Sequence, residues 1–395
     1  MALTFSTTGH QWSQSIPTKQ PFYIFSNGVL MRRENTICFV PQVTQEEVTI
    51  ETDPLLYFES DELESFSLNP VNSDKLNTGG RRVIPINNID SFFVFGEVNF
   101  NTKFLNFLTK YHIPMHLFNY YGFYSGSYYP REYLLSGFLV VHQVKHYSSL
   151  KRRLEIAREF IEAAAANIAR NLKYYTADSR QAALGQESVD MLLLTIAQIE
   201  SLSGTIAMAS DIPCLMGIEG NIRKLYYQSW QHLLRSADPA FSFSERVKRP
   251  PDNAVNALVS FGNSLMYSAC LTEIYRTQLN PTISFLHEPS ERRFSLALDM
   301  AEIFKPMFID RMIFKLVNTR EIQAKHFTTA LNFCHLNDAG RKIVVKEFEE
   351  RMRTTIKHRG LGRDVSYRRL IRLECYKLIK HLIGEDSYHA FRNWW

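Results

Sequence analysis

The sequence contains few cysteines, and they lie far apart. Its 395 residues include five, with no CxxC pair among them: Cys38, Cys214, Cys270, Cys334 and Cys375. An odd number at this spacing argues against a disulfide framework and against a cysteine-ligated zinc site. The pattern is typical of a protein in a reducing cytoplasm, which is the location we expect.

Long hydrophobic runs and a strong charge excess are also missing. No stretch of about 18 apolar residues occurs, so the sequence predicts no membrane span. The N-terminus has no basic region followed by an apolar run, so we expect no signal peptide. The formal net charge is +5 and the pI is about 8.8. This mildly basic balance permits a nucleic-acid partner but does not identify one.

The first third of the chain has the pattern of a small β domain. Residues 1–20 are polar, and we expect a flexible leader there. Within residues 21–120, short aromatic and β-branched runs alternate with turn residues, and Asn27-Gly28 predicts a hairpin. The acidic segment at residues 41–80 belongs to this domain, but its composition assigns it no role.

The remainder of the chain has a helical pattern. Residues 121–147, which begin rich in Tyr, Gly and Ser, are predicted to be a linker. After it, apolar residues recur every three or four positions, at Leu154, Ala157, Ile161, Ala164, Ile168 and Leu172. Similar periodicity extends over 189–230, 252–279, 292–320 and 364–383. The sequence therefore predicts an α+β protein, with the β domain followed by a larger α-helical catalytic domain at residues 148–395.

Two isolated residues are candidates for chemistry. Glu219 lies among Gly and Ile residues, and a carboxylate in such apolar surroundings is paired, protonated or bound to metal. Taken alone, a glutamate in the first turn of a helix, stabilised by the helix dipole, is the better explanation. His287 ends an apolar run just before Pro289. A structural histidine is the commoner explanation for such a residue.

Asp299 and Glu302 form a third candidate. They lie three residues apart in an apolar helical run, so they share one face of the helix. Two buried carboxylates on one face repel each other unless a cation joins them. The alternative is that one of them caps a helix or pairs with Arg311.

Together these residues fit a divalent-metal site. Two carboxylates and one imidazole leave positions open on Mg²⁺ or Mn²⁺ for a phosphate oxygen and a nucleophile. The lack of cysteine in the set argues against structural zinc. From the residues alone, Asp299 and Glu302 remain competing choices for the third ligand beside Glu219 and His287.

Basic residues that would neutralise phosphates surround these candidates along the chain. They are Arg223, Arg246, Lys248, Arg249, Arg292 and Arg293. A further basic stretch at 351–359 is equally well explained as a solvated helix face. Aromatic residues in 118–129 would stack on exposed bases, but packing at a domain junction is the better explanation for them.

The order and spacing of these residues resemble the CRISPR-associated integrases of spacer acquisition, the Cas1 family. The likeness extends from about residue 22 to the C-terminus. Three segments resemble the motifs of the family: Glu219-Gly220 with Tyr226, Phe285-Leu286-His287-Glu288, and Leu298-Asp299 through Lys305-Pro306. Between the first two, Arg249-Pro250-Pro251-Asp252, Asn256 and Ser260-Phe261-Gly262 are also similar.

The resemblance implies a Mn²⁺- or Mg²⁺-dependent DNA endonuclease and integrase. It implies that Glu219, His287 and Glu302 hold the metal and perform catalysis, with Asp299 and Asn256 as accessory residues. The implied reaction is transesterification, which joins the 3′-hydroxyl ends of a short prespacer into a CRISPR array. The implied partners are double-stranded DNA, a second copy of the chain, and a small second adaptation subunit in a heterohexamer.

Three positions before His287 depart from the family pattern. Gln278 replaces a glycine, Asn280 replaces an aspartate and Ser284 replaces a glycine. They change the expected shape of the loop rather than its ligand. Two alternatives to the CRISPR integrase are a related integrase of a mobile element and a DNA-binding scaffold that kept the fold without catalysis.

Overall fold

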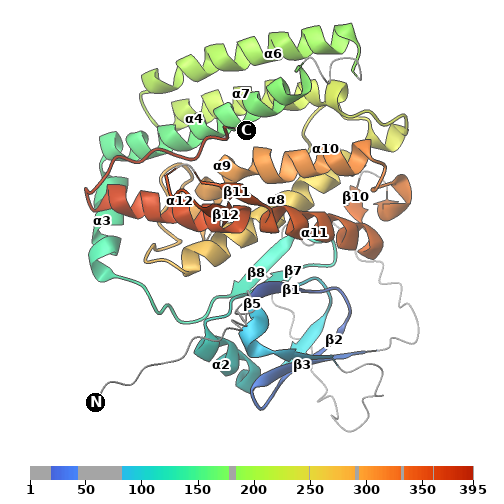
Figure 1. Cartoon of the computed structure of the whole chain (residues 1–395), viewed down its shortest axis with the longest axis vertical. Coiled ribbons are helices and arrows are strands. Elements are labelled where there is room, and N and C mark those ends of the chain that lie inside the picture. The colour runs from blue at the N-terminus through green and yellow to red at the C-terminus, as the bar shows by residue number, and fades with distance from the viewer. Residues whose placement is uncertain are drawn as a thin grey trace, which may run out of the picture. The chain divides into compact units, whose positions relative to one another are not determined.

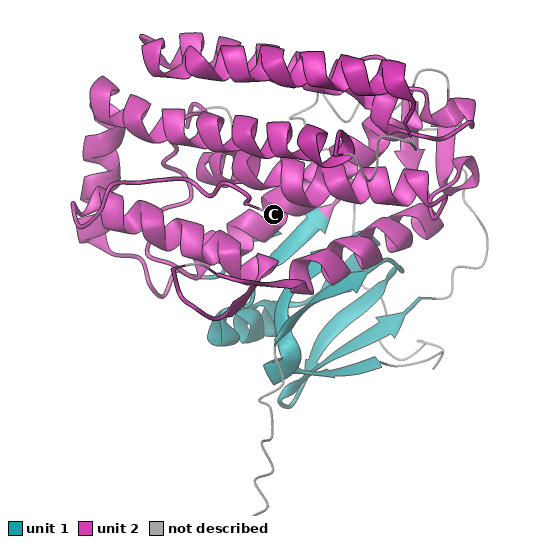
Figure 2. Cartoon of the chain, turned by 45° about the horizontal axis from the view of Figure 1, so that its top comes forward, with its two compact units in different colours: residues 1–117, 127–130 teal, residues 118–126, 131–395 magenta. Residues whose placement is uncertain are grey.

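The computed structural model describes residues 19–42, 82–177, 184–248, 250–289, 293–330, 333–358 and 360–394. Most of the predicted leader and of the acidic 41–80 segment lies outside these described residues. The chain forms two compact units (Figure 2). The first comprises Met1–Leu117 with Ser127–Pro130, and the second comprises Phe118–Gly126 with Arg131–Trp395.

The first unit is built around short strands (Figure 1). One sheet has the order β1 (Gln20–Ile24), β5 (Ile89–Val94), β7 (Met115–Phe118) and β8 (Tyr124–Tyr128). The other has the order β4 (Arg82–Pro85), β3 (Thr36–Pro41), β2 (Gly28–Arg33) and β6 (Val98–Phe100). Helix α2 (Thr102–Tyr111) contributes Phe104 and Phe107 to the core, where they join Phe92. These rings supply much of the apolar area that stabilises so small a unit.

The predicted hairpin at Asn27-Gly28 is wrong. Strands β1 and β2 lie in different sheets, because β1 pairs with β5 while β2 pairs with β3 and β6. The Asn27 side chain accepts a hydrogen bond from the Glu97 backbone N–H at 2.8 Å. A Cβ on Gly28 would lie 2.5 Å from the Val40 carbonyl oxygen, so the glycine is needed for close packing rather than for a turn.

The second unit is mainly helical. Its α-helices are α3 (Gly137–Ser148), α4 (Leu150–Tyr175), α6 (Gln186–Gly204), α7 (Ile212–Leu233), α8 (Ala254–Tyr275), α9 (Ser295–Lys305), α10 (Arg311–Asn318), α11 (Asp338–Arg353) and α12 (Tyr367–Leu382). Almost every residue of α8 is buried, and this helix packs against α9 and α12. The predicted α+β class, a β region followed by a larger helical region, is confirmed.

Several elements depart from the sequence pattern. The range predicted as a linker, 121–147, contains β8 and nearly all of α3, whose N-cap is Ser136. The helical unit also contains two ribbons, β9 (Phe327–Ala330) with β10 (Phe333–Leu336) and β11 (Thr355–Lys357) with β12 (Asp364–Ser366). Strands of three or four residues are too short to show a period, which explains why the sequence does not reveal them.

Helix α6 bears on the expectation that no segment spans a membrane. With the turn that follows, Gln186–Met208 is long and apolar enough to cross a membrane by length and composition, and an 18-residue window of it has a mean hydropathy of 1.4. Polar residues such as Asp190 and Glu200 interrupt its apolar run, so a search for uninterrupted runs misses it. The helix packs against α4 and α7 through buried Leu192 and Ile196. One such helix is weak evidence for a membrane, although only 28% of its apolar window is buried, which is less than in a typical core helix.

Candidate metal centre

Glu219 lies in the middle of a helix rather than at its start. Helix α7 begins after Asp211, whose side chain accepts a hydrogen bond from the Cys214 N–H at 2.8 Å, and Pro213 occupies the first turn. Glu219 follows about two turns later, beyond the reach of the free N–H groups of the helix. The helix-dipole explanation of this residue therefore does not apply, and its charge is balanced by another group.

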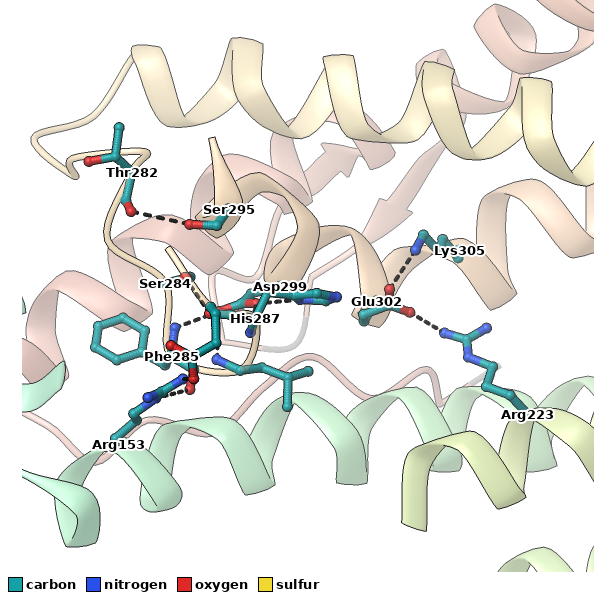
Figure 3. Close-up of polar contacts among 12 residues, drawn as sticks. Arg153, Arg223, Thr282, Ser284, Phe285, His287, Ser295, Asp299, Glu302 and Lys305 are labelled. Carbon is teal, nitrogen blue, oxygen red and sulfur yellow. Dashed lines mark hydrogen bonds and ion pairs between the residues drawn. The ribbon is translucent and has the colours of Figure 1, made fainter. Parts of the chain in front are cut away.

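That group is Arg223, one turn further along α7. Its Nε donates to Glu219 Oε1 at 2.9 Å. Its Nη2 donates to Glu302 Oε2 at 2.5 Å (Figure 3). Burial of the guanidinium opposes its charge, but Glu302 and Glu219 outweigh that effect and hold the pKa of Arg223 above its usual value. The two carboxylates are thus brought together from α7 and α9 by one cation.

Glu302 has a second cationic partner. Lys305, three residues later on α9, donates to Glu302 Oε1 at 2.5 Å. Burial alone would raise the pKa of Glu302, but the charges of Lys305 and Arg223 lower it to about 2. The carboxylate is therefore ionised at neutral pH although only 8% of the residue is exposed.

The Asp299 carboxylate forms its hydrogen bonds with the loop that carries His287. It is buried, and its Oδ2 accepts hydrogen bonds from the backbone N–H groups of Phe285 and Leu286 at 2.7 and 2.9 Å. Its Oδ1 lies 3.0 Å from the backbone nitrogen of His287 and 2.8 Å from the ring Nδ1 of the same residue. These four contacts leave Asp299 little capacity to bind a metal directly, which argues for Glu302 in that role. Arg311, the sequence-predicted partner, donates to Asn171 instead.

The His287 ring is oriented by a hydrogen bond at one of its two nitrogens. Nδ1 donates to the Asp299 carboxylate, which leaves Nε2 free to accept a hydrogen bond or bind a metal. Burial alone would lower the pKa of His287, but the hydrogen bond and charge of Asp299 raise it above 6.5. A carboxylate–histidine pair of this kind is common behind metal-bound imidazoles.

The loop that carries His287 is also held from its other side. Arg153 on α4 donates to the Phe285 carbonyl oxygen at 2.7 Å and to Glu288 Oε1 at 2.7 Å. Tyr147 donates to Glu288 Oε2 at 3.1 Å. The sequence analysis missed Arg153 and Lys305. Lys305 had a local signal, its spacing of three from Glu302; Arg153 lies 134 positions from His287 in the chain and had none.

Among the described residues, no three His, Cys, Asp or Glu side chains lie close enough together to enclose an ion as they stand. The donor set nevertheless fits a hard divalent cation, because Glu219 and Glu302 supply carboxylate oxygens and His287 supplies an imidazole with a fixed tautomer. The cation that now lies between the two carboxylates is the Arg223 guanidinium. A divalent ion in place of that guanidinium would add one unit of positive charge beside the same two carboxylates.

The other predicted residues divide into three groups. Asn256 is buried and organises the preceding loop: its Oδ1 accepts from Arg246 at 3.0 Å and its Nδ2 donates to Asp252 at 2.7 Å. Lys248 is exposed as a residue, and the charges of Glu219 and Glu302 act on its amine. Partial burial of the amine, together with the charges of Arg246 and Lys305, lowers the pKa of Lys248. Arg249 and Arg292 lie outside the described residues, and Arg293 is exposed with its guanidinium 5.0 Å from the centre of the Phe294 ring.

Two wider sequence patterns have structural explanations. Tyr121 packs edge-on against Phe333 at 4.7 Å between ring centres and lies beside His335, as expected for a packing role. In the basic stretch, Arg351 pairs with Glu347 and Arg353 with Glu349 along α11. These residues therefore lie on the charged face of a helix, which is the alternative that the sequence left open.

Comparison with known proteins gives the family. The family model "CRISPR associated protein Cas1" matches residues 72–350. A CRISPR-associated endonuclease Cas1 of Fusobacterium nucleatum is 45% identical over 377 residues, which cover 95% of this chain and 97% of that protein. Another from Moorella thermoacetica is 44% identical over 95% of this chain and 99% of its own length.

Solved structures give the same fold. The Cas1 protein TM1797 of Thermotoga maritima aligns with a TM-score of 0.76 and 37% identity over 94% of this chain and all of that one. A casposase bound to its integration product aligns over 92% of this chain and 91% of its own, with a TM-score of 0.71 at 18% identity, a likeness of fold. Family model, sequence identity and fold agree: this chain belongs to the Cas1 family of CRISPR-associated endonucleases.

Proposed function

We propose that this chain is a metal-dependent integrase that joins the 3′-hydroxyl ends of short prespacer DNA into a CRISPR array. The observation that supports the proposal most strongly is the meeting of Glu219 and Glu302 at Arg223, beside His287 with its ring fixed by Asp299. Two carboxylates that share one cation, near an imidazole with a free Nε2, supply the donor types that a phosphodiester-transferring metal site requires.

In this mechanism Glu219, His287 and Glu302 hold Mn²⁺ or Mg²⁺. A divalent ion held there would supply positive charge to polarise the scissile phosphate and stabilise its oxygens. Asp299 keeps the proton on His287 Nδ1 so that Nε2 stays available as a ligand. Lys305 and Lys248 supply positive charge for the DNA phosphates. A bound 3′-hydroxyl outcompetes water because binding makes its attack effectively intramolecular.

The same proposal covers the partners. The substrates are double-stranded DNA, namely a prespacer and a CRISPR repeat, and the protein acts in the cytoplasm. We expect a homodimer that assembles with a small second adaptation subunit into a heterohexamer. A structure named as a Cas6-RT-Cas1–Cas2 complex has a chain that aligns with 99% of this one at 15% identity, a likeness of fold alone.

Strand transfer tests the proposal directly. A labelled prespacer is incubated with a repeat-bearing plasmid, the chain, its small partner and Mn²⁺. Glu219→Gln and His287→Asn should lower the yield of joined strands by at least a hundredfold while DNA binding persists, because the ligands are lost but the basic residues remain. Glu200→Gln, which removes an exposed carboxylate paired with Lys173, is the matched control and should keep full activity. Full activity in either ligand variant would refute the metal site.

The choice of target DNA separates the alternatives. A CRISPR integrase should join the prespacer at the boundary of the repeat and require the small partner. Insertion into unrelated DNA without that partner would favour an integrase of a mobile element. Strand binding with no metal-dependent joining would favour a scaffold.

A further inference from the structure

The position between the two carboxylates is already filled by a side-chain cation. Arg223 is 9% exposed and bonds to Glu219 and Glu302 at once, through Nε and Nη2. A divalent ion bound by the same carboxylates, as in the proposed function on which this inference rests, competes with the guanidinium for their oxygens. A buried guanidinium displaced without a new partner is strongly unfavourable. Metal uptake therefore needs a second anionic partner for Arg223 within reach.

Asp310 is a buried carboxylate in the right place. It ends the π-helical turn η5 (Pro306–Asp310), which directly follows α9, and it is 1% exposed. It accepts a hydrogen bond from Tyr226, which lies three residues after Arg223 on the same face of α7. Within the described part of the chain, Asp310 Oδ2 has no hydrogen-bond partner. A buried carboxylate oxygen without a donor is uncommon and calls for an explanation.

The raised pKa of Asp310 agrees with a carboxylate that has no cation bonded to it among the described residues. Burial raises the pKa of Asp310 to about 7, with the Arg223 charge as the first influence in the opposite direction. The carboxyl groups of Glu302 and Asp310 thus differ sharply, since the pKa of Glu302 is lowered to about 2 by its bonded cations. The charge of Arg223 acts on both carboxyl groups, but of the two only Glu302 accepts a hydrogen bond from its guanidinium.

We propose that Asp310 is the alternative ion-pair partner of Arg223, which receives the guanidinium when Glu219 and Glu302 bind the metal. The charges of Arg223 and Asp310 already act on each other, so the exchange requires the long Arg223 side chain to change its conformation. Asp310 does not touch metal or DNA in this scheme; it is a positioning residue that makes the metal site available. Asp310 ends a π-helical turn, and such turns are frequent at functional sites.

Mn²⁺ affinity, measured by electron paramagnetic resonance titration of the full chain without DNA, tests this coupling. Asp310→Asn should weaken Mn²⁺ binding about tenfold, because the guanidinium then has no other anion. Arg223→Met should bind at least as tightly as the wild type, because the competing cation is gone. In Arg223→Met/Asp310→Asn, the second substitution should change the affinity by less than about twofold. Circular dichroism melting checks that each variant is folded.

The double variant separates an effect through Arg223 from simple loss of nearby negative charge. A purely electrostatic effect of Asp310 would weaken Mn²⁺ binding equally with and without Arg223, and that result overturns the proposal, as does wild-type affinity in Asp310→Asn. Asp310→Ser repeats the measurement should the asparagine variant unfold. Glu374→Gln, which alters a fully buried carboxyl on α12 that is bonded to Tyr388, is the matched control and should leave Mn²⁺ binding unchanged.

The same titration distinguishes failure of this coupling from failure of the metal site. If the wild type shows no Mn²⁺ binding that Glu219→Gln abolishes, the proposed metal site itself is wrong and the role of Asp310 falls with it. If Glu219-dependent binding is present but insensitive to Asp310, the metal site stands and only the role of Asp310 is refuted.

Discussion

Asp299 holds His287 by both its ring and its backbone. One carboxylate oxygen, Oδ1, lies 2.8 Å from the ring Nδ1 and 3.0 Å from the backbone nitrogen of the same histidine. The other oxygen accepts two further backbone N–H groups of the loop. A single buried side chain therefore fixes the tautomer of the imidazole, the direction of its free nitrogen and the path of the chain around it.

Substitution of Asp299 by Asn is the first test of that relationship. The amide replaces one carboxylate oxygen, an acceptor, with an NH2 group, a donor. The groups around Asp299 are backbone N–H donors and the His287 Nδ1, which must carry a proton if Nε2 is to bind the metal, so the new donor has no acceptor to meet. We expect Mn²⁺ affinity to fall by about 10- to 100-fold, as for other groups that orient metal-bound histidines. Equilibrium titration measures it. The control is Asp338→Asn, an exposed carboxylate on α11; equal affinities for both variants would contradict the role of Asp299.

The sequence identifies the ligands better than it identifies their supports. Glu219, His287 and Glu302 could be found because each is a polar residue in an apolar segment, and their order resembles a family pattern. The choice between Asp299 and Glu302 needed the three-dimensional contacts, since both lie on one helix face. Asp310 could not be assigned at all, because its position depends on a π-helical turn that no period in the sequence indicates.

The wrong predictions of secondary structure also arise because contacts between distant parts of the chain override local sequence patterns. The Asn27-Gly28 dipeptide predicts a tight hairpin from local chemistry alone, but the pairing of β1 with β5 is decided by contacts some 70 residues away in the chain. Helix α3 begins in a stretch whose composition resembles a loop, and tertiary packing overrides that local preference. Long amphipathic helices such as α4 were predictable because their periodicity extends over many turns.

Substitution of Arg153 tests whether its hydrogen bonds to the loop that carries His287 matter for catalysis. Arg153→Leu removes the donor to the Phe285 carbonyl oxygen and the partner of Glu288, while it keeps the apolar stem. A lost charge-assisted hydrogen bond to a loop beside the ligand should lower the rate of strand transfer by about tenfold or more. Single-turnover kinetics measure the rate. Arg158→Leu is the matched control, because that residue lies on the same helix but donates to Ala209; equal losses in the two variants would contradict a local effect.

We expect His335 to make the protein sensitive to mild acid. Burial, with a smaller effect of Arg341, lowers its pKa to about 4, and its Nδ1 has no hydrogen-bond partner among the described residues. Below the unfolded value of about 6.5, the unfolded chain takes up a proton that the folded chain does not. Stability is therefore full above pH 6.5 and falls by up to about 3 kcal/mol as the pH drops to about 4.

His335→Phe should remove this part of the acid sensitivity. Phenylalanine fits beside the rings of Tyr121 and Phe333 and binds no proton. The difference in unfolding free energy between variant and wild type should therefore grow as the pH falls from 6.5 to 4 and remain constant above 7. Urea unfolding at a series of pH values measures it. Parallel curves for the two proteins would show that His335 titrates normally.

Gly262 tests the packing that positions the π-helical turn. A Cβ built on this residue of α8 would lie 2.5 Å from Ile309 Cγ2, so Gly262→Ala must push Ile309, and with it the turn that ends at Asp310, away from the helix. We expect a loss of about 1–3 kcal/mol in unfolding free energy from overpacking. Gly220→Ala on α7 is the matched control: a Cβ there meets no atom within 4 Å, so the change should stabilise the helix by up to about 1 kcal/mol. Thermal unfolding of both variants measures the difference, and a Gly262→Ala protein as stable as the wild type would show that the turn moves freely against α8.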